Sequence, residues 1–160
     1  MPSPLIEREI TSRVALTTPD GALNLDALGW SRVPLHDTSG IPGRAHWGRN
    51  KRWEYWNVMT PSHIVAFTIS CVDYMALHEV WVLDRTTGDE IGSTVISPGA
   101  RSAMLPASLG SGPARARTRR MELDVDETFD GTRLRGSAPR VSFDMLAARP
   151  AGHESLGVVV

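Results

Sequence analysis

The sequence predicts an all-β protein in which an antiparallel meander forms a barrel, a half-barrel or a sandwich. Segments rich in β-branched and aromatic residues recur along the chain, and apolar and polar side chains alternate within them. Turn signals that contain Gly, Pro, Asn or Asp separate these segments at a spacing of roughly ten residues. No segment has the periodicity of a long amphipathic helix, although residues 24–30 could form one helical turn.

The composition is that of one globular β domain occupying residues 1–160. Of these 160 residues 41% are hydrophobic and 22% charged, and the formal net charge is -1, so neither disorder nor a nucleic-acid partner is expected. The chain shows no secretory signal pattern, and no apolar run reaches the ~20 residues of a membrane helix. We therefore expect a cytoplasmic protein without a membrane span. Scattered histidines, a single cysteine and missing nucleotide motifs predict neither a metal site nor a cofactor.

The first part of the predicted meander comprises four segments: 51–59, 63–73, 79–84 and 91–96. In the second of these, Val65 and Ile69 fall on the same face, and polar residues alternate with them. The turn between the last two contains Gly88, which can adopt a positive φ. Consecutive strands joined by short turns are typical of an antiparallel sheet.

Residues 98–120 interrupt this pattern, because they are rich in Gly, Pro, Ser and Ala and end in a cluster of arginines. We expect a long flexible loop there. Strict alternation from Met121 to Asp126 then predicts a strand with one face in water. Further short strands are expected over three segments: 133–139, 140–147 and 155–160. The chain ends in three valines, so the last strand must either pair internally or leave an apolar edge open.

Residues 43–61 concentrate aromatic side chains. On the predicted strand 51–59, Trp53 and Tyr55 share one face, while Arg52 and Trp56 share the other. We expect one face to pack in the core and the other to line a cavity or a second layer. The expected ligand-binding residues come from this segment and from the turn near residue 74: His46, Trp47, Arg52, Trp53, Tyr55, Trp56 and Tyr74. Two packed layers without a ligand are the alternative.

Four cations precede or begin this aromatic strand: Arg44, Arg49, Lys51 and Arg52. They could bind phosphate groups of a nucleic acid, but the protein is neutral overall, so solvated loop charges are the expected role. A guanidinium also pairs bidentately with carboxylate or phosphate. The second interpretation is therefore that the arginines hold the head group of a mainly apolar ligand.

Residues 73–79 gather groups that can transfer protons. Asp73 and Tyr74 end one predicted strand, and His78 and Glu79 begin the next. A carboxyl group in an apolar cavity stays protonated and can act as an acid, so the candidate catalytic residues are Asp73 and His78. The alternative is that Asp73 and Tyr74 are ordinary turn residues. Cys71 lies on the apolar face of its strand and is expected to be an inert core thiol.

Four stretches resemble a bacterial family catalogued as domain of unknown function 2804: "GWSRVPLH" (29–36), "HWGRNKRWEYWNVMTP" (46–61), "DYMALHEVWVLDRTTGDE" (73–90) and "RPAGHESLGVVV" (149–160). The resemblance implies a lipocalin-like (calycin-type) fold, distantly similar to carotenoid hydratases and tocopherol cyclases. It also implies a cavity for a small apolar molecule of lipid or isoprenoid type. Members of the family are longer, so the chain resembles their N-terminal half, and it could complete its sheet as a homodimer through an exposed strand edge.

Three functions remain as alternatives, and the sequence leaves open whether the protein is an enzyme. The first is binding of a small apolar molecule against Trp53, Tyr55 and Trp56, as part of a hydratase- or cyclase-like enzyme in which Asp73 protonates a double bond. His46 is an accessory group in this interpretation. The second is a non-catalytic β-sandwich that binds carbohydrate on an exposed tryptophan platform. The third is an interaction domain whose open strand edge recruits a partner.

Overall fold

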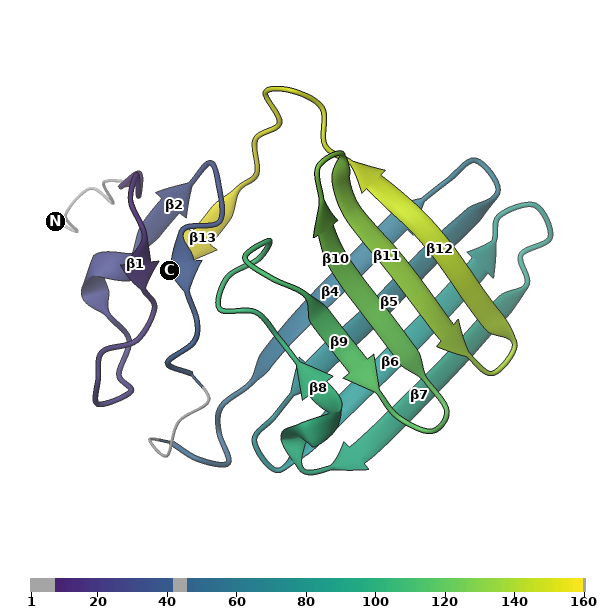
Figure 1. Ribbon diagram of the computed structural model, residues 1–160, viewed down its shortest axis with the longest axis horizontal. Helices are drawn as coiled ribbons and strands as arrows, with labels where there is room; N and C mark the ends of the chain where they lie inside the picture. The colour runs from purple at the N-terminus through teal and green to yellow at the C-terminus, as the bar shows by residue number, and fades with distance from the viewer. Residues whose placement is uncertain (1–7, 42–45, 160) are drawn as a thin grey trace, which may run out of the picture.

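The computed structural model describes residues 8–41 and 46–159, and its main body consists of two antiparallel sheets (Figure 1). The all-β prediction is confirmed. The two sheets do not close into a barrel, and their arrangement is consistent with a half-barrel or a sandwich. Arg44, one of the four predicted loop cations, lies outside the described residues.

The first sheet is a meander of four consecutive strands: β4 (Arg52–Met59), β5 (His63–Cys71), β6 (Met75–Asp84) and β7 (Glu90–Pro98). Three of these strands coincide closely with the predicted segments, whereas β6 begins four residues before the predicted segment 79–84. Alternation along β5 points Phe67 and Ile69 inward, and both side chains are almost completely buried. The apolar pattern of period two therefore sets which face of this sheet forms the core.

The second sheet has the strand order β12-β11-β10-β9-β8: β8 (Ala103–Met104), β9 (Ala114–Arg117), β10 (Glu122–Thr128), β11 (Gly131–Ala138) and β12 (Val141–Ala148). Here the structure differs from the expectation of a flexible loop over 98–120, because this segment contains β8, β9 and the short 3-10 helix η2 (Ala100–Ser102). Ala114 and Ala116 of β9 are fully buried and pair with β10. Alanine has a low strand propensity, so tertiary burial overrides the local pattern.

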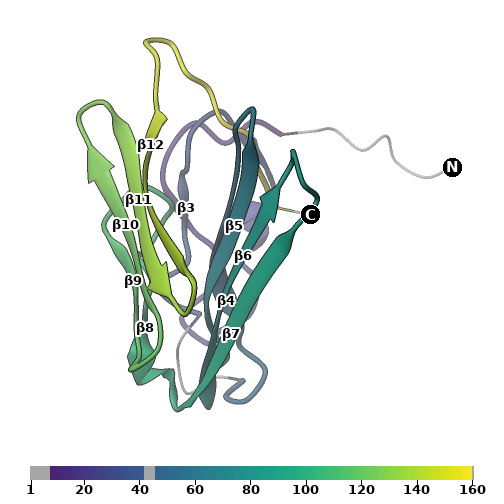
Figure 2. The same cartoon turned by 90° about the vertical axis from the view of Figure 1, so that its right-hand side faces the viewer.

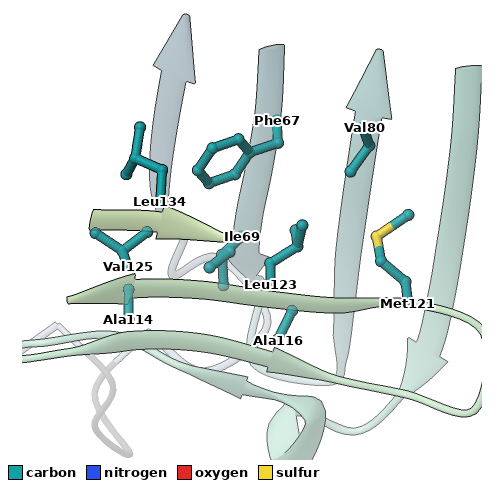
Figure 3. Packing of buried hydrophobic residues seen from close by; sticks show 9 residues of the cluster. All are labelled: Phe67, Ile69, Val80, Ala114, Ala116, Met121, Leu123, Val125 and Leu134. Carbon is teal, nitrogen blue, oxygen red and sulfur yellow. The ribbon is translucent and has the colours of Figure 1, made fainter. Parts of the chain in front are cut away.

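The hydrophobic core lies between the two sheets, as the side chains in Figure 3 show. Phe67 of β5 stacks on Phe143 of β12 with a distance of 5.4 Å between the ring centroids. Gly136 on β11 leaves the space for this contact, because a Cβ atom there would lie 2.3 Å from the ring of Phe143. Met121 and Leu123 complete the packing from the second sheet.

The outer face of the second sheet carries a ladder of ion pairs between neighbouring strands. Its members are Arg115, Arg117, Asp124, Asp126, Arg133, Arg135 and Asp144. The alternation predicted from Met121 to Asp126 is therefore confirmed, with the carboxylates in water and the apolar residues in the core. In Figure 2 this sheet stands on the left and the β4–β7 sheet faces it on the right.

Two small sheets lie beside the main body, on the left of Figure 1. β1 (Val14–Ala15) pairs with β3 (His36–Asp37) in parallel, and β2 (Gly29–Ser31) pairs with β13 (Gly157–Val159) in antiparallel orientation. The predicted helical turn is η1 (Leu25–Ala27). Of the two fates expected for the last strand, the structure shows internal pairing, with Val158 opposite Trp30.

Candidate functional site

A pocket of about 440 Å³ lies between the two sheets and the segments that flank them; we call it the inter-sheet pocket. Trp56 of β4 and Ala147 of β12 supply apolar wall, and four charged or titratable side chains line the same pocket: Arg13, Glu127, Arg149 and His153. An apolar concavity with a few converging polar groups is the usual form of a small-molecule site. The inter-sheet pocket is therefore the candidate functional site.

A network of polar side chains forms one side of the inter-sheet pocket. Thr132 Oγ1 donates a hydrogen bond to Glu127 Oε1 at 2.9 Å, and Arg149 Nη2 donates to Glu127 Oε2 at 2.7 Å. Arg149 also contacts Thr132 Oγ1 at 3.2 Å. The guanidinium balances the negative charge of Glu127, and the network holds both groups at the pocket edge.

Glu54 is a buried carboxyl group beside this network. It lies on the inward face of β4 and is 9% exposed, and Trp56 Nε1 donates a hydrogen bond to its Oε1 at 2.8 Å. Burial raises the pKa of Glu54 above its ordinary value of 4.5, the Trp56 hydrogen bond opposes this, and the negative charge of Glu127 adds to it. The carboxyl group of Glu54 therefore keeps its proton to a higher pH than an exposed glutamate does.

Glu54 and Arg52 line a second hollow of about 300 Å³, which we call the edge hollow, and neither residue is among those that line the inter-sheet pocket. Arg52 donates hydrogen bonds to Thr38 Oγ1 at 3.0 Å and to the carbonyl oxygen of Pro106. Partial burial lowers the pKa of Arg52. Leu109 lines both the edge hollow and the inter-sheet pocket, so the two cavities adjoin at this residue.

The two aromatic faces of β4 have different surroundings. Trp56 lines the inter-sheet pocket, which agrees with the expectation that one aromatic face of this strand points inward. Trp53 and Tyr55 lie on the outer face and are 64% and 55% exposed. The sequence pattern predicts that the face with Trp53 and Tyr55 lines a cavity or packs against a second layer if the other face forms the core. This expectation is wrong, because no described strand packs over that face.

Asp73, Tyr74 and Trp47 lie at one end of the β4–β7 sheet, and neither they nor His46, which precedes Trp47 in the chain, line the inter-sheet pocket. Asp73 Oδ2 accepts hydrogen bonds from the backbone N–H groups of Gly48 at 2.7 Å and of residue 50 at 3.2 Å. Trp47 and Tyr74 make an edge-to-face contact at 6.3 Å. The Asp73 carboxylate thus joins two turns, which corresponds to the alternative of a structural turn residue.

His78 does not share the turn with Asp73, contrary to the sequence-based expectation. The turn ends before Met75, and His78 is a fully buried residue of β6 that faces the core. Its Nε2 lies 3.0 Å from Ser102 Oγ in η2, and its Nδ1 has no partner among the described residues. Burial lowers the pKa of His78. The residue is a neutral core imidazole.

Among residues 8–41 and 46–159, no group of three or more His, Cys, Asp or Glu side chains is arranged to hold a metal ion. No helix in this part of the chain is long and apolar enough to cross a membrane.

The fold and the pocket define an all-β protein with a small-molecule-sized cavity between its sheets. Residues 7–160 match the family described as Domain of unknown function (DUF2804). The chain belongs to this family, as the resemblance suggested. Comparison with curated proteins and with solved structures found no match.

Four charged or titratable residues of the inter-sheet pocket were not expected from the sequence: Arg13, Glu127, Arg149 and His153. Glu54, in the adjoining edge hollow, was not expected either. Glu54 carried a usable signal, since it lies on the same predicted strand face as Trp56 and a carboxylate on an inward face is unusual. Glu127 and Arg149 carried no such signal. They come from β10 and from the segment after β12, and only the folded chain brings them together.

Proposed function

We propose that the protein binds a small, largely apolar molecule of lipid or isoprenoid type in the inter-sheet pocket. The observation that supports this is the composition of the pocket, in which Trp56 and Ala147 form apolar wall and Arg13, Arg149 and His153 line it together with Glu127. The volume of about 440 Å³ lies within the range of ordinary ligand pockets. Trp56 is the member of the expected ligand-binding set that contributes most directly.

The head group of this molecule is a carboxylate or a phosphate. Arg149 uses Nη2 for its bonds to Glu127 and Thr132, and a guanidinium has further N–H donors available. Arg13 is exposed and lines the same pocket, together with His153. An anion there would gain charge-assisted hydrogen bonds while the apolar part of the ligand contacts Trp56.

Hydratase- or cyclase-like chemistry is the finer form of this proposal. It requires a neutral carboxylic acid next to an aromatic ring, and Glu54 meets this requirement better than Asp73, whose carboxylate is bonded to two backbone N–H groups. Glu54 lines the edge hollow, which adjoins the inter-sheet pocket at Leu109. A ligand whose double bond extends into this hollow would take the proton of Glu54 and form a C–H bond with the electrons of the double bond. The resulting cation on the neighbouring carbon would be stabilised by the face of Trp56.

The binding proposal is tested with cis-parinaric acid, a fluorescent polyene carboxylate. Ala147→Phe fills the pocket from β12 and should weaken binding at least tenfold. Leu146→Phe is the matched control, because Leu146 is the next residue on the same strand, is 51% exposed and points outward. Equal affinities of Ala147→Phe and wild type would refute the proposed site.

The proposed protonation of a double bond by Glu54 is tested with geranylgeraniol in deuterium oxide. Wild type should incorporate deuterium from solvent into carbon-bound positions, as read by mass spectrometry. Glu54→Gln should lose this incorporation but keep its affinity for cis-parinaric acid. Incorporation that persists in Glu54→Gln would remove Glu54 from the mechanism, whereas no incorporation by wild type would leave binding as the whole function.

A further inference from the structure

The outer faces of the two sheets differ in chemistry. The face of the β8–β12 sheet is covered by Arg–Asp pairs, as expected for a surface that only contacts water. The face of the β4–β7 sheet instead exposes Trp53 and Tyr55. Large exposed aromatic side chains grouped on one face indicate a binding surface, and this surface is separate from the inter-sheet pocket.

Two hollows adjoin on this outer face. The first, of about 330 Å³, lies between Trp53 and Tyr55 and has Thr68 and Ser70 among its lining residues. The second, of about 220 Å³, is bordered by Tyr55 and by Trp81 of β6, and Thr68 belongs to it as well. Because both hollows contain Tyr55 and Thr68, they form a continuous row of three aromatic side chains; we call it the aromatic row.

Neighbouring side chains hold the rings of the aromatic row in place. Trp81 Nε1 donates a hydrogen bond to Glu90 Oε2 at 3.1 Å. Asn57 Nδ2 donates to the hydroxyl of Tyr55 at 3.1 Å. A ring held before a ligand arrives loses less conformational entropy on binding.

The polar groups around the aromatic row favour a ligand with many hydroxyls. Glu79 borders the second hollow and Lys51 the first, and neither has an ion-pair partner within the described part of the chain. An apolar protein surface laid over Glu79 would bury a carboxylate without a partner, at a cost of several kcal/mol. A ligand with C–H faces for the rings and hydroxyls for Glu79, Lys51 and Thr68 avoids this cost.

We propose that the aromatic row binds an extended chain of pyranose sugars, with its sugar rings stacked on Trp53, Tyr55 and Trp81. Trp53 and Tyr55 lie two residues apart on β4, which separates them by roughly 6.6 Å along the strand. Trp81 follows on β6, across the intervening strand β5, so the aromatic row runs diagonally over the sheet face. A linear chain can follow this row from one hollow to the next. The ligand is therefore an unbranched, extended oligosaccharide.

Isothermal titration calorimetry with cellohexaose, xylohexaose and mannohexaose tests this site. Wild type should bind at least one of these three chains. Trp53→Ala should weaken that binding at least tenfold, and Glu79→Gln should weaken it several-fold. Phe129→Ala is the control, because Phe129 is a fully exposed aromatic side chain in the turn between β10 and β11 and should leave binding unchanged.

Three results would overturn the proposal. The first is that wild type binds none of the three oligosaccharides, and the second is that Trp53→Ala and Phe129→Ala lose the same amount of oligosaccharide affinity. The third is that wild type forms a dimer which Trp53→Ala converts to a monomer. The last result, measured by analytical ultracentrifugation, would assign the face to a second copy of the chain. Ala147→Phe should retain oligosaccharide binding, which separates this site from the inter-sheet pocket.

Discussion

Trp56 and Glu54 of β4 are joined by a hydrogen bond of 2.8 Å from the indole N–H to a carboxyl oxygen that is almost completely buried. The two side chains point into the protein from the same strand face. They place a titratable group next to an aromatic wall of the inter-sheet pocket.

Glu54 makes stability depend on pH. Its pKa is raised in the folded state, chiefly by burial. The folded state therefore binds the proton more tightly than the unfolded state, so the contribution of Glu54 is fully present below pH 4.5 and is lost as pH rises through the folded-state pKa. Glu54→Gln should melt at a higher temperature than wild type at pH 8 and at an equal temperature near pH 4. Glu122→Gln, at an exposed position, is the calorimetric control.

His78 should act in the opposite sense. Burial lowers its pKa below 6.5, so the stability that the neutral imidazole provides is fully present above pH 6.5 and is lost as pH falls through the folded-state pKa. His78→Leu removes the hydrogen bond to Ser102 and should cost about 1 kcal/mol at pH 8. Urea unfolding should show a smaller deficit at pH 5.5. A constant deficit would contradict this, and His153→Gln is the control at an exposed histidine.

Gly136 should tolerate no side chain. A Cβ atom there would lie 2.3 Å from the ring of Phe143, which stacks on Phe67 in the core. Gly136→Ala should lower the free energy of unfolding by about 1–3 kcal/mol. Gly92→Ala is the matched control on β7, because its nearest neighbour would be 4.0 Å away. Similar denaturation midpoints for the two variants would show that Phe143 can move aside.

Asp73 should matter for stability and not for ligand binding. Its carboxylate accepts the backbone N–H groups of Gly48 and of residue 50, and the loss of hydrogen bonds to a charged group costs about 1.5–3 kcal/mol. Asp73→Ala should therefore be destabilised by this amount, and amide exchange at Gly48 should accelerate. Asp73→Asn keeps an acceptor and should lose less. A loss of cis-parinaric acid affinity in folded Asp73→Ala would restore the catalytic-site interpretation.

Arg149 should select ligands with an anionic head. Arg149→Met removes the guanidinium next to the pocket and should weaken binding of cis-parinaric acid about tenfold, which corresponds to about 1.4 kcal/mol. The methyl ester of cis-parinaric acid has no negative charge and should bind wild type and Arg149→Met with equal affinity. If Arg149→Met weakens binding of the ester as much as binding of the acid, the effect comes from the lost contact between Arg149 and Glu127. The proposal that Arg149 binds the anionic head group would then be wrong.

The strands were predictable where their signal is local. Alternation placed Phe67 inward and Asp124 outward, and both positions are confirmed. The prediction failed for β9, because Ala114 and Ala116 carry no strand signal of their own and are buried only by the opposing sheet. A residue with weak intrinsic preference takes its conformation from its neighbours in space.

The candidate site was predictable only in part. Trp56 was expected either to point into the core or to contact a ligand, and it lines the inter-sheet pocket. Asp73 and His78 were expected to lie together because they are close in sequence, yet a turn and a strand point them in different directions. Proximity along the chain did not predict proximity of side chains, since successive residues of a strand face opposite sides.

The sequence by itself determined the all-β class, the order of the main strands along the chain and the inward faces of β5 and β10. These properties follow from side-chain alternation and turn chemistry, which act within a few residues. Only the tertiary structure decided that Glu54, Glu127 and Arg149 share one region and that Trp53 and Tyr55 face outward. The relative placement of two sheets depends on how their cores pack, and that packing joins residues far apart in the chain.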